Sequence, residues 1–203
     1  MGGEVGGEAG GEPRLAPLLR EQLDAEQLAM WDALAAGPRG ARAVREEGFL
    51  TGPFDALLRS PQVGAAVAGL GGLLRFDSSL DPRHRELAII TVAARWRARY
   101  AWLRHDVYAR EAGVPQEAID AIAEDRTPSF ERADDRAVHD LVHQLAHTGA
   151  VDDEAYAAAL AQIGERGLVD LVALAGYYCI TSFVLNTFRV PLPPGDRVPW
   201  DPA

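Results

Sequence analysis

Apolar residues recur at helical spacing along most of the chain. The segment LDAEQLAMWDALAAGPRG predicts a helix that begins at or before Asp24 and ends at Gly37 and Pro38. The segment GFLTGPFDALLRSPQVGAAVAGLGGLLRF predicts a loop and then two helices, broken at Ser60 and Pro61. Because no segment shows sustained strand alternation, the chain is predicted to be all-α.

The clearest helical pattern lies in LDPRHRELAIITVAARWRA, where Pro82 occupies the first turn. A second helix is predicted over roughly residues 100 to 112 and stops at Gly113. Further helices are predicted over PQEAIDAIAED, RADDRAVHDLVHQLAHTG, DDEAYAAALAQIG and RGLVDLVALAGYYCITSFVLNTF. The Pro-rich segment VPLPPGDRVPWDPA is incompatible with a helix. Charged turns precede apolar helices at residues 80–90 and 163–174, so a duplicated helical unit stays open as an alternative.

The N-terminal sequence MGGEVGGEAGGEPR is acidic and rich in Gly, which predicts a disordered tail over residues 1–14. We expect residues 15–203 to form a single helical domain. The tail has neither the basic nor the apolar region of a signal peptide. The longest apolar run is interrupted by Asp170, Gly176 and Asn186, so no membrane span is expected. These observations predict a cytoplasmic protein.

Composition excludes several classes of function. The net charge of −10 disfavours nucleic acid as a partner, because a phosphate backbone would be repelled. All 20 basic residues are arginine, and the absence of lysine excludes lysine Schiff-base enzymes and the Walker phosphate loop. The single cysteine, Cys179, excludes an intrachain disulfide and a Cys-x-x-Cys redox pair. Its apolar surroundings indicate a small core residue.

The region from residue 83 to residue 110 contains residue types suited to acid–base chemistry. Seven of the 20 arginines lie there, and such a cluster attracts a small anion or simply solvates helix faces. Glu86 lies in the first turn of its predicted helix, where the dipole favours a carboxylate, and it is a candidate for the mouth of a buried site. His105 is spaced helically with small residues, which leave room beside its ring. The alternative is a purely structural hydrogen-bonded pair.

Other side chains around this region are candidates for substrate contacts. Tyr100 and Trp102 are expected to wall a pocket, and Tyr100 can supply a hydroxyl donor. Arg97 and Arg104 are candidate clamps for a carboxylate. Phe54, in the loop TGPF, is expected to cover the site.

Three histidines, His139, His143 and His147, follow one another at intervals of four residues. This spacing can place two imidazoles on one metal ion, but the outer pair is ~12 Å apart along a helix axis. The pattern therefore favours a polar, solvent-facing stripe over a site for all three. We expect that the reaction uses no metal and no organic cofactor.

The segment LDPRHRELAIITVAARWRARYAWLRHDVYAREAGVPQEAIDAI resembles the carboxymuconolactone decarboxylase family, which has an alkylhydroperoxidase-like all-α fold. The residues that match the family pattern are Leu80, Pro82, Arg83, Arg85, Glu86, Leu87, Ala88, Tyr100, Trp102, His105, Ala109 and Gly113. The likeness extends over residues 31 to 194. The most specific part of it is the spacing between Glu86 and His105.

Two departures from the family pattern restrict the reaction that the resemblance implies. The peroxidase branch carries a Cys-x-x-Cys pair where this chain has Ala98 and Ala101, so dithiol reduction of peroxides is excluded. Decarboxylase-like members usually carry Glu at the position of Ala101. The resemblance implies a cofactor-independent enzyme acting on a small carboxylate, lactone or enone through His105, Glu86 and Tyr100. It further implies a dimer or trimer with a small anionic substrate.

Two other functions stay open at this stage. One is a cofactor-free isomerase, cyclase or dehydratase acting on an intermediate of specialised metabolism. The other is a helical oligomer that binds a small hydrophobic acid without catalysis. The same acid–base residues suit each of these reactions, so the sequence leaves the product undetermined.

Overall fold

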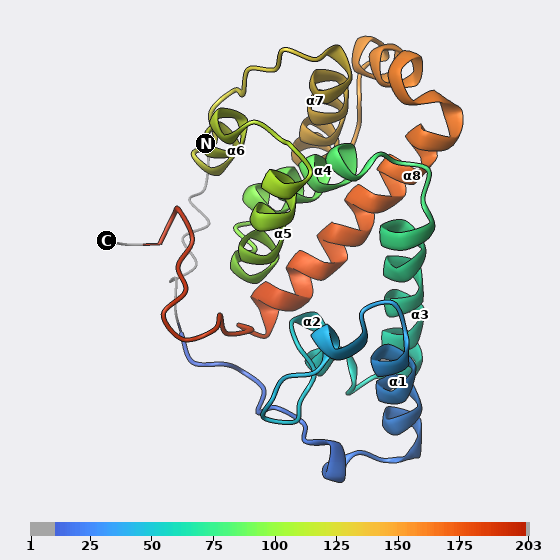
Figure 1. Cartoon of the computed structure of the whole chain (residues 1–203), viewed down its shortest axis with the longest axis vertical. Coiled ribbons are helices and arrows are strands. Elements are labelled where there is room, and N and C mark those ends of the chain that lie inside the picture. Colours follow the sequence, from blue (N-terminus) through green and yellow to red (C-terminus); the bar gives the residue numbers. More distant parts are fainter. Residues whose placement is uncertain (1–10, 202–203) are drawn as a thin grey trace.

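The computed structural model describes residues 11–201, and these residues fold into helices joined by short loops (Figure 1). The elements are η1 (Arg20–Gln22), α1 (Ala25–Ala36), η2 (Gly40–Ala43), α2 (Pro53–Leu57), α3 (Pro61–Gly72), η3 (Leu73–Asp77), α4 (Pro82–Arg95), α5 (Arg99–Glu111), α6 (Gln116–Ala123), α7 (Ala133–Thr148) and α8 (Asp153–Thr187). None of the described residues lies in a named strand, and the predicted all-α class is confirmed.

Helix α4 is the centre of the main core. Asp81 caps it by accepting a hydrogen bond from the Arg83 amide, and Pro82 fills the first turn. Every residue from 86 to 94 is buried, and all of them except Glu86 and Thr91 are apolar. It packs against α5, α7 and α8, and α8 crosses the molecule diagonally in Figure 1.

The N-terminal helices form a second, smaller core. Helix α1 begins after Asp24, within the predicted bounds, and the Asp24 carboxylate caps the Gln27 amide. Its buried residues Met30 and Trp31 belong to a cluster with Leu58 of the α2–α3 connection. Helix α3 then runs beside α8, so the second core is joined to the first.

The predicted helix boundaries are confirmed at several positions. The break between α2 and α3 falls at Ser60, and α7 ends at Gly149, which has a left-handed φ of 77°. The two helices predicted after residue 150 lie end to end in α8. At Gly164 the backbone leaves the helical region, with φ 68° and ψ 175°, so α8 consists of two helices across a kink.

The two ends of the described chain pack against the helical core. Most of the predicted tail, residues 1–10, lies outside the described residues. Arg14 binds the end of α8 through hydrogen bonds from its amide to the Phe188 carbonyl and from its guanidinium to the Thr187 carbonyl. The C-terminal segment is non-helical, as expected, and Trp200 packs edge-on against Trp102 at 5.0 Å between ring centroids.

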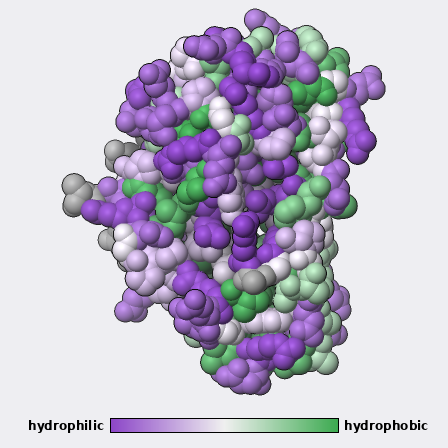
Figure 2. Space-filling model, in the orientation of Figure 1, coloured by the Kyte–Doolittle hydropathy of each residue, from purple (hydrophilic) through white to green (hydrophobic). Residues whose placement is uncertain are grey.

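Helix α8 is long and apolar enough to cross a membrane by length and composition alone. In this structure half of its most apolar stretch is buried inside the protein, where it contacts α4 and α7. Figure 2 shows that the visible face of the molecule is mostly hydrophilic, with smaller apolar patches. We therefore assign α8 as a core helix, and no membrane is indicated.

A close approach between α3 and α8 depends on Gly71. A Cβ atom at this position would lie 2.1 Å from the hydroxyl oxygen of Tyr177, whose ring is buried. We predict that Gly71→Ala lowers the free energy of unfolding by about 1–3 kcal/mol, because the Tyr177 ring has to move inside a packed core. Urea denaturation followed by circular dichroism measures this loss.

Gly69→Ala is the matched control for that change. Gly69 lies on the exposed side of the same helix, and a Cβ there would meet no atom within 4 Å. This substitution is expected to stabilise the protein by about 0.5–1 kcal/mol, because alanine loses less backbone entropy than glycine in a helix. Equal effects of the two substitutions would contradict the role assigned to Gly71.

Candidate active site

Three side chains from three helices form a buried chain of hydrogen bonds. His105 of α5 lies with its Nδ1 atom 2.6 Å from Oε2 of Glu86, on α4. The hydroxyl oxygen of Tyr178, on α8, lies 3.0 Å from Nε2 of the same ring. All three side chains are buried. We call this chain of Glu86, His105 and Tyr178 the relay.

The relay follows from the way in which α4 turns into α5. The connection is three residues long, and Arg97 within it has a positive φ of 48°. This sharp turn folds α5 back along α4, so Glu86 near the start of one helix faces His105 in the middle of the next. Helix α8 then packs against both helices and brings in Tyr178.

The surroundings determine the charge of each relay residue. Burial lowers the pKa of His105, and the opposing effect of its hydrogen bond to Glu86 does not reverse this shift. Burial favours a higher pKa for Glu86, but the His105 hydrogen bond and the nearby Arg75 and Arg85 outweigh it and lower the pKa. Burial raises the pKa of Tyr178 far above its ordinary value. The relay therefore holds a carboxylate, a neutral imidazole and a protonated phenol at neutral pH.

These charges fix the direction of the hydrogen bonds. The phenol of Tyr178 donates to Nε2 of His105, so this nitrogen is the unprotonated one. The Nδ1–H group then donates to the Glu86 carboxylate. This arrangement is ready to accept a proton through Tyr178, because the resulting imidazolium would lie beside a carboxylate.

A cavity of about 140 Å³ opens beside the relay. Its lining residues are Pro38, Arg39, Arg42, Ala43, Thr51, Gly52, Pro53, Phe54, Arg75, Phe76, Tyr100, Ala101, Arg104, His105, Tyr108, Tyr177, Tyr178, Thr181 and Leu185. Four of them are arginines, and six are Phe or Tyr. The cavity thus combines a strongly basic lining with aromatic walls, which suits a small, flat anion.

Arg75 is the arginine most closely coupled to the relay. Its charge acts on the pKa of Glu86, His105 and Tyr178. Its guanidinium lies over the rings of Phe76 and Tyr108, 5.6 Å from each centroid. Its Nε atom is buried and has no hydrogen-bond partner among the described residues. Arg75 itself lines the cavity, so its positive charge favours an anion there.

The structure brings only part of the predicted site together. Phe54, Tyr100 and Arg104 line the cavity with His105. Glu86 is nearly inaccessible behind His105, instead of lying at the mouth of the site. Tyr100 reaches the cavity, but the hydroxyl on His105 is that of Tyr178.

Arg97 and Trp102 lie outside the cavity, so the site as predicted is corrected at both positions. Arg97 precedes α5 and donates to the Ala123 carbonyl at 3.2 Å, with its guanidinium over the Trp200 ring. Trp102 is buried on the side of α5 that packs against Trp200. Both side chains hold the C-terminal segment against α5.

Sequence reasoning missed Tyr178, Arg75, Arg39 and Tyr108. The tyrosine pair in the apolar run AGYYCITSF is a signal that could have indicated Tyr178, because a buried phenol needs a hydrogen-bond partner. The arginines gave no such signal. Arg75 lies in the π-helical turn η3, whose wider winding alters which way successive side chains face.

The two positions that carry cysteines in the peroxidase branch are alanines that differ in their access to the cavity. Ala101 lines it, and its small side chain leaves space directly beside His105. Ala98 is fully buried at the start of α5. Cys179 lies outside the cavity lining, and burial raises the pKa of its thiol. The cavity therefore offers a phenol and an imidazole for chemistry.

The prediction that three histidines of α7 face solvent is wrong for one of them, His139. His139 is buried, 5.4 Å from the Phe130 ring by centroid distance, and hydrogen-bonds Asp140. His143 and His147 are exposed, with their rings stacked at 4.0 Å. The helix turns His139 toward the core because α7 packs against α4 and α8 along that side.

Residues 61–133 match the model of the carboxymuconolactone decarboxylase family. This part of the chain is therefore similar to that family. This segment includes Glu86, Ala98, Ala101 and His105, and the resemblance seen in the sequence is confirmed over these residues. Tyr178 lies beyond the matched residues.

Solved structures with the same fold cover more of the chain. An alkylhydroperoxidase AhpD core protein from Ralstonia eutropha JMP134, described as an uncharacterized peroxidase-related protein, matches with a TM-score of 0.70. It is 15% identical, over 92% of this chain and 95% of its own. The debrominase Bmp8, as a cysteine-to-alanine variant in complex with 2,3,4-tribromopyrrole, matches with a TM-score of 0.68 and 13% identity. That match covers 90% of this chain and 95% of the other.

A third structure is a protein of unknown function from Agrobacterium tumefaciens, described as a putative antioxidant defence protein AhpD. It matches with a TM-score of 0.60 and 19% identity, over 70% of this chain and 99% of its own. No curated protein shows a significant sequence match to the chain. At these identities the structures establish the alkylhydroperoxidase-like fold.

The directions of the relay hydrogen bonds can be tested without a substrate. We predict that Tyr178→Phe raises the pKa of His105, because the phenol donates to Nε2 and stabilises the neutral ring. Glu86→Gln is expected to lower this pKa, because a neutral amide no longer stabilises the imidazolium. Nuclear magnetic resonance titration of the ring Cε1–H signal measures both shifts, and His105→Gln identifies that signal. Shifts in the same direction for both variants would contradict the assigned tautomer.

Proposed function

We propose that this protein is a cofactor-independent acid–base enzyme that moves a proton on a small carboxylate, lactone or enone. The observation that carries the proposal is the relay of Glu86, His105 and Tyr178, which ends at an arginine-lined cavity. The similarity to the carboxymuconolactone decarboxylase family supports an enzymatic role. Positioned acid–base groups typically accelerate proton transfer by ~10²- to 10⁴-fold.

The resting relay favours removal of a proton as the first step. A substrate C–H bond next to a carbonyl breaks as its proton passes to the Tyr178 oxygen, while the phenol proton passes to Nε2 of His105. The electron pair of the C–H bond becomes an enolate, and the new imidazolium is stabilised by Glu86. Return of the proton to another carbon completes an isomerisation and restores the relay.

The cavity supports a small, flat, anionic substrate. A cavity of about 150 Å³ in another protein holds benzene, so one ring fits here. We propose that Arg75 and Arg104 bind the substrate carboxylate, while Phe54, Tyr100 and Tyr108 contact its faces. Arg39 lies over the Phe54 ring at 5.0 Å and extends the basic lining.

Decarboxylation is the second candidate, favoured by the same arginines that would hold a carboxylate. Carbon dioxide would leave without the bonding electron pair, which would become an enolate on an adjacent lactone or enone. That enolate then needs a proton, and Tyr178 can donate one without becoming a buried phenolate only when a protonated His105 replaces it. Because burial lowers the pKa of His105, this form is scarce at neutral pH, and proton removal is the better-supported first step.

The compartment, the oligomeric state and the partners of the protein are part of the proposal. We expect a cytoplasmic homo-oligomer, a dimer or trimer, whose partners are small molecules rather than nucleic acid or membranes. Exposed apolar side chains support self-association: these include Val63, Leu70, Leu73, Phe76, Val169, Val172, Ile180 and Phe183. Sedimentation velocity of the full chain measures the oligomer size.

Hydrogen–deuterium exchange at carbon tests the enzymatic proposal without knowledge of the natural product. We predict that the protein speeds deuterium incorporation from D₂O into small carboxylates that carry a ketone, lactone or enone. Proton nuclear magnetic resonance follows the loss of the C–H signal, and released carbon dioxide is measured in parallel. His105→Gln is expected to lower the rate by ~10²- to 10⁴-fold.

A double-variant comparison distinguishes a joint unit from independent groups. Glu86→Gln with His105→Gln should be little slower than the slower single variant, because groups that act together are non-additive. Arg97→Gln is the control, since Arg97 lies outside the cavity. Folded single variants with wild-type rates would refute the catalytic role of the relay. Binding of the acids without exchange or carbon dioxide release would support the non-catalytic alternative.

The pH dependence of exchange decides between the two first steps. If neutral His105 removes the proton, the rate should fall as the pH drops through the lowered pKa of His105, below the ordinary value of 6.5. If protonated His105 has to donate, the rate should fall as the pH rises through the same pKa. Measuring the rate between pH 4.5 and 8 with an acid that stays ionised, and checking folding at each pH, separates the two outcomes.

A further inference from the structure

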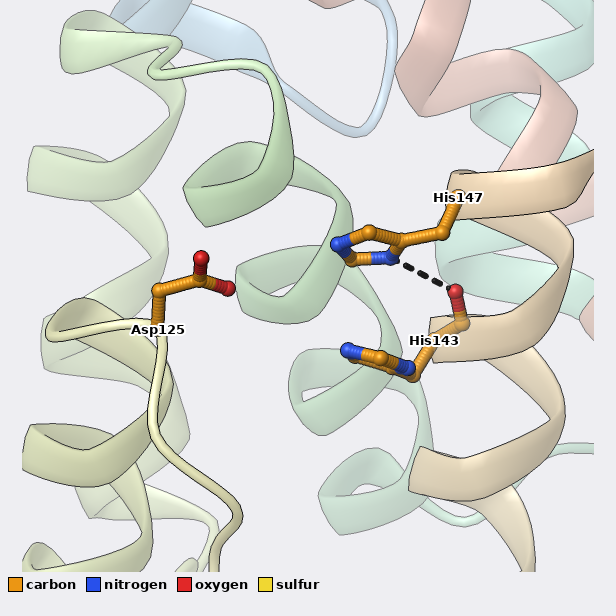
Figure 3. A group of neighbouring side chains, drawn as sticks. All are labelled: Asp125, His143 and His147. Carbon is orange, nitrogen blue, oxygen red and sulfur yellow. Dashed lines mark hydrogen bonds between the residues drawn. The ribbon is translucent and has the colours of Figure 1, made fainter. Parts of the chain in front are cut away.

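A second group of chemically active side chains lies on the surface, outside the cavity (Figure 3). It consists of Asp125, in the linker after α6, with His143 and His147 on α7. Each residue offers one ligand atom, and these atoms lie within 4.8 Å of one another. The two histidines are four residues apart, so they lie on the same face of their helix.

Both rings present a nitrogen toward the carboxylate. The Nδ1–H group of His147 donates to the His143 carbonyl at 2.8 Å, which leaves Nε2 as the unprotonated nitrogen. The two rings stack with an angle of 27° between their planes, and Figure 3 shows their outer edges directed at Asp125. A backbone hydrogen bond of this kind commonly orients a metal-binding histidine.

The backbone holds Asp125 in place opposite the rings. This residue has a left-handed φ of 57°, a conformation that Asp and Asn tolerate better than most residues. Its amide donates to the Ile122 carbonyl at 3.2 Å, which ties it to the last turn of α6. The carboxylate therefore projects from a constrained turn rather than from a freely moving loop.

A second cluster of possible ligands differs from the Asp125 cluster in the charge around its carboxylates. His84, Asp134 and Asp135 also lie close together, but Arg83 binds Asp135 and Arg132 binds Asp134. Those guanidinium groups already neutralise the carboxylates. By contrast, Arg126, the arginine next to Asp125 in the chain, pairs with Glu124.

We propose that Asp125, His143 and His147 form a binding site for a divalent transition-metal ion, with zinc as the ion of closest fit. The ligands would be Nε2 of each imidazole and one carboxylate oxygen. Two nitrogens and one oxygen suit zinc, whose bonds to them are about 2.0–2.2 Å long, and disfavour magnesium, which prefers oxygen ligands. Small rotations of the exposed side chains would bring the ligand atoms to that spacing.

The metal would have a structural role rather than a catalytic one. None of its three ligands lines the cavity beside the relay. The ion would join the beginning of the 124–132 linker to the C-terminal half of α7. Zinc is therefore expected to reduce opening of this linker and to leave the relay unaffected.

Isothermal titration of the metal-free full chain with zinc chloride tests the site. We expect one zinc ion per chain, and an affinity for magnesium chloride at least about 100-fold weaker. His147→Gln and Asp125→Asn should each weaken zinc binding at least about tenfold, the lower bound for loss of even an outer-shell partner. Asn at position 125 keeps the backbone conformation, so the second variant removes charge without strain.

Glu124→Gln is the matched control, because it removes one negative charge from the adjacent exposed residue, which pairs with Arg126. It should leave zinc affinity unchanged within about twofold. Hydrogen exchange provides a second measurement: zinc should slow exchange in residues 124–132 of the wild type and not of His147→Gln.

Several results would overturn the proposal. Zinc binding unchanged in both His147→Gln and Asp125→Asn, or no binding by the wild type, would show that these residues do not form a site. Equal affinity for magnesium and zinc would contradict the ligand set. Loss of binding in His84→Gln, with His147→Gln unaffected, would assign the zinc to the other cluster.

Discussion

The hydrogen bond between Glu86 and His105 is the constraint on which the rest of the structure depends. An ionised carboxylate buried without a partner would cost several kcal/mol, so α4 and α5 must pack with these two side chains in contact. The short connection between the helices, with the positive φ of Arg97, meets that requirement. The same requirement explains why polar residues occur in the most buried part of the chain.

Helix α8 supplies Tyr178, the third residue of the relay, and thereby fixes the direction of the hydrogen bonds. Tyr178 donates to the Nε2 atom of His105, and losing it would cost about as much as a lost hydrogen bond. The same helix carries Tyr177 against Gly71, so α3 can approach closely and η3 can place Arg75 at the cavity. Gly71 therefore contributes to the core and to the cavity, because the close contact that it permits also helps to position Arg75.

Local signals in the sequence are sufficient to predict the helices and two of the three relay residues, Glu86 and His105. Asp24, Pro82 and Gly149 act within one turn of the helix ends that they mark. Glu86 and His105 lie 19 residues apart in one contiguous pattern. Tyr178 lies 73 residues from His105, so their contact depends on tertiary packing that no local spacing encodes. The sequence does not show that Arg97 and Trp102 face away from the cavity. The turn before α5 determines which side of that helix faces the cavity.

The fold alone does not determine the reaction, because the group placed before the histidine decides what is transferred. A thiol beside the imidazole would make a nucleophile or an electron carrier, whereas this chain has Ala101 there and a phenol on the other side. Burial raises the pKa of the Tyr178 phenol, so it stays protonated and can donate its proton to His105. The small side chain of Ala101 also lets a substrate approach His105 directly. The proposed proton transfer therefore depends on these side chains rather than on the fold.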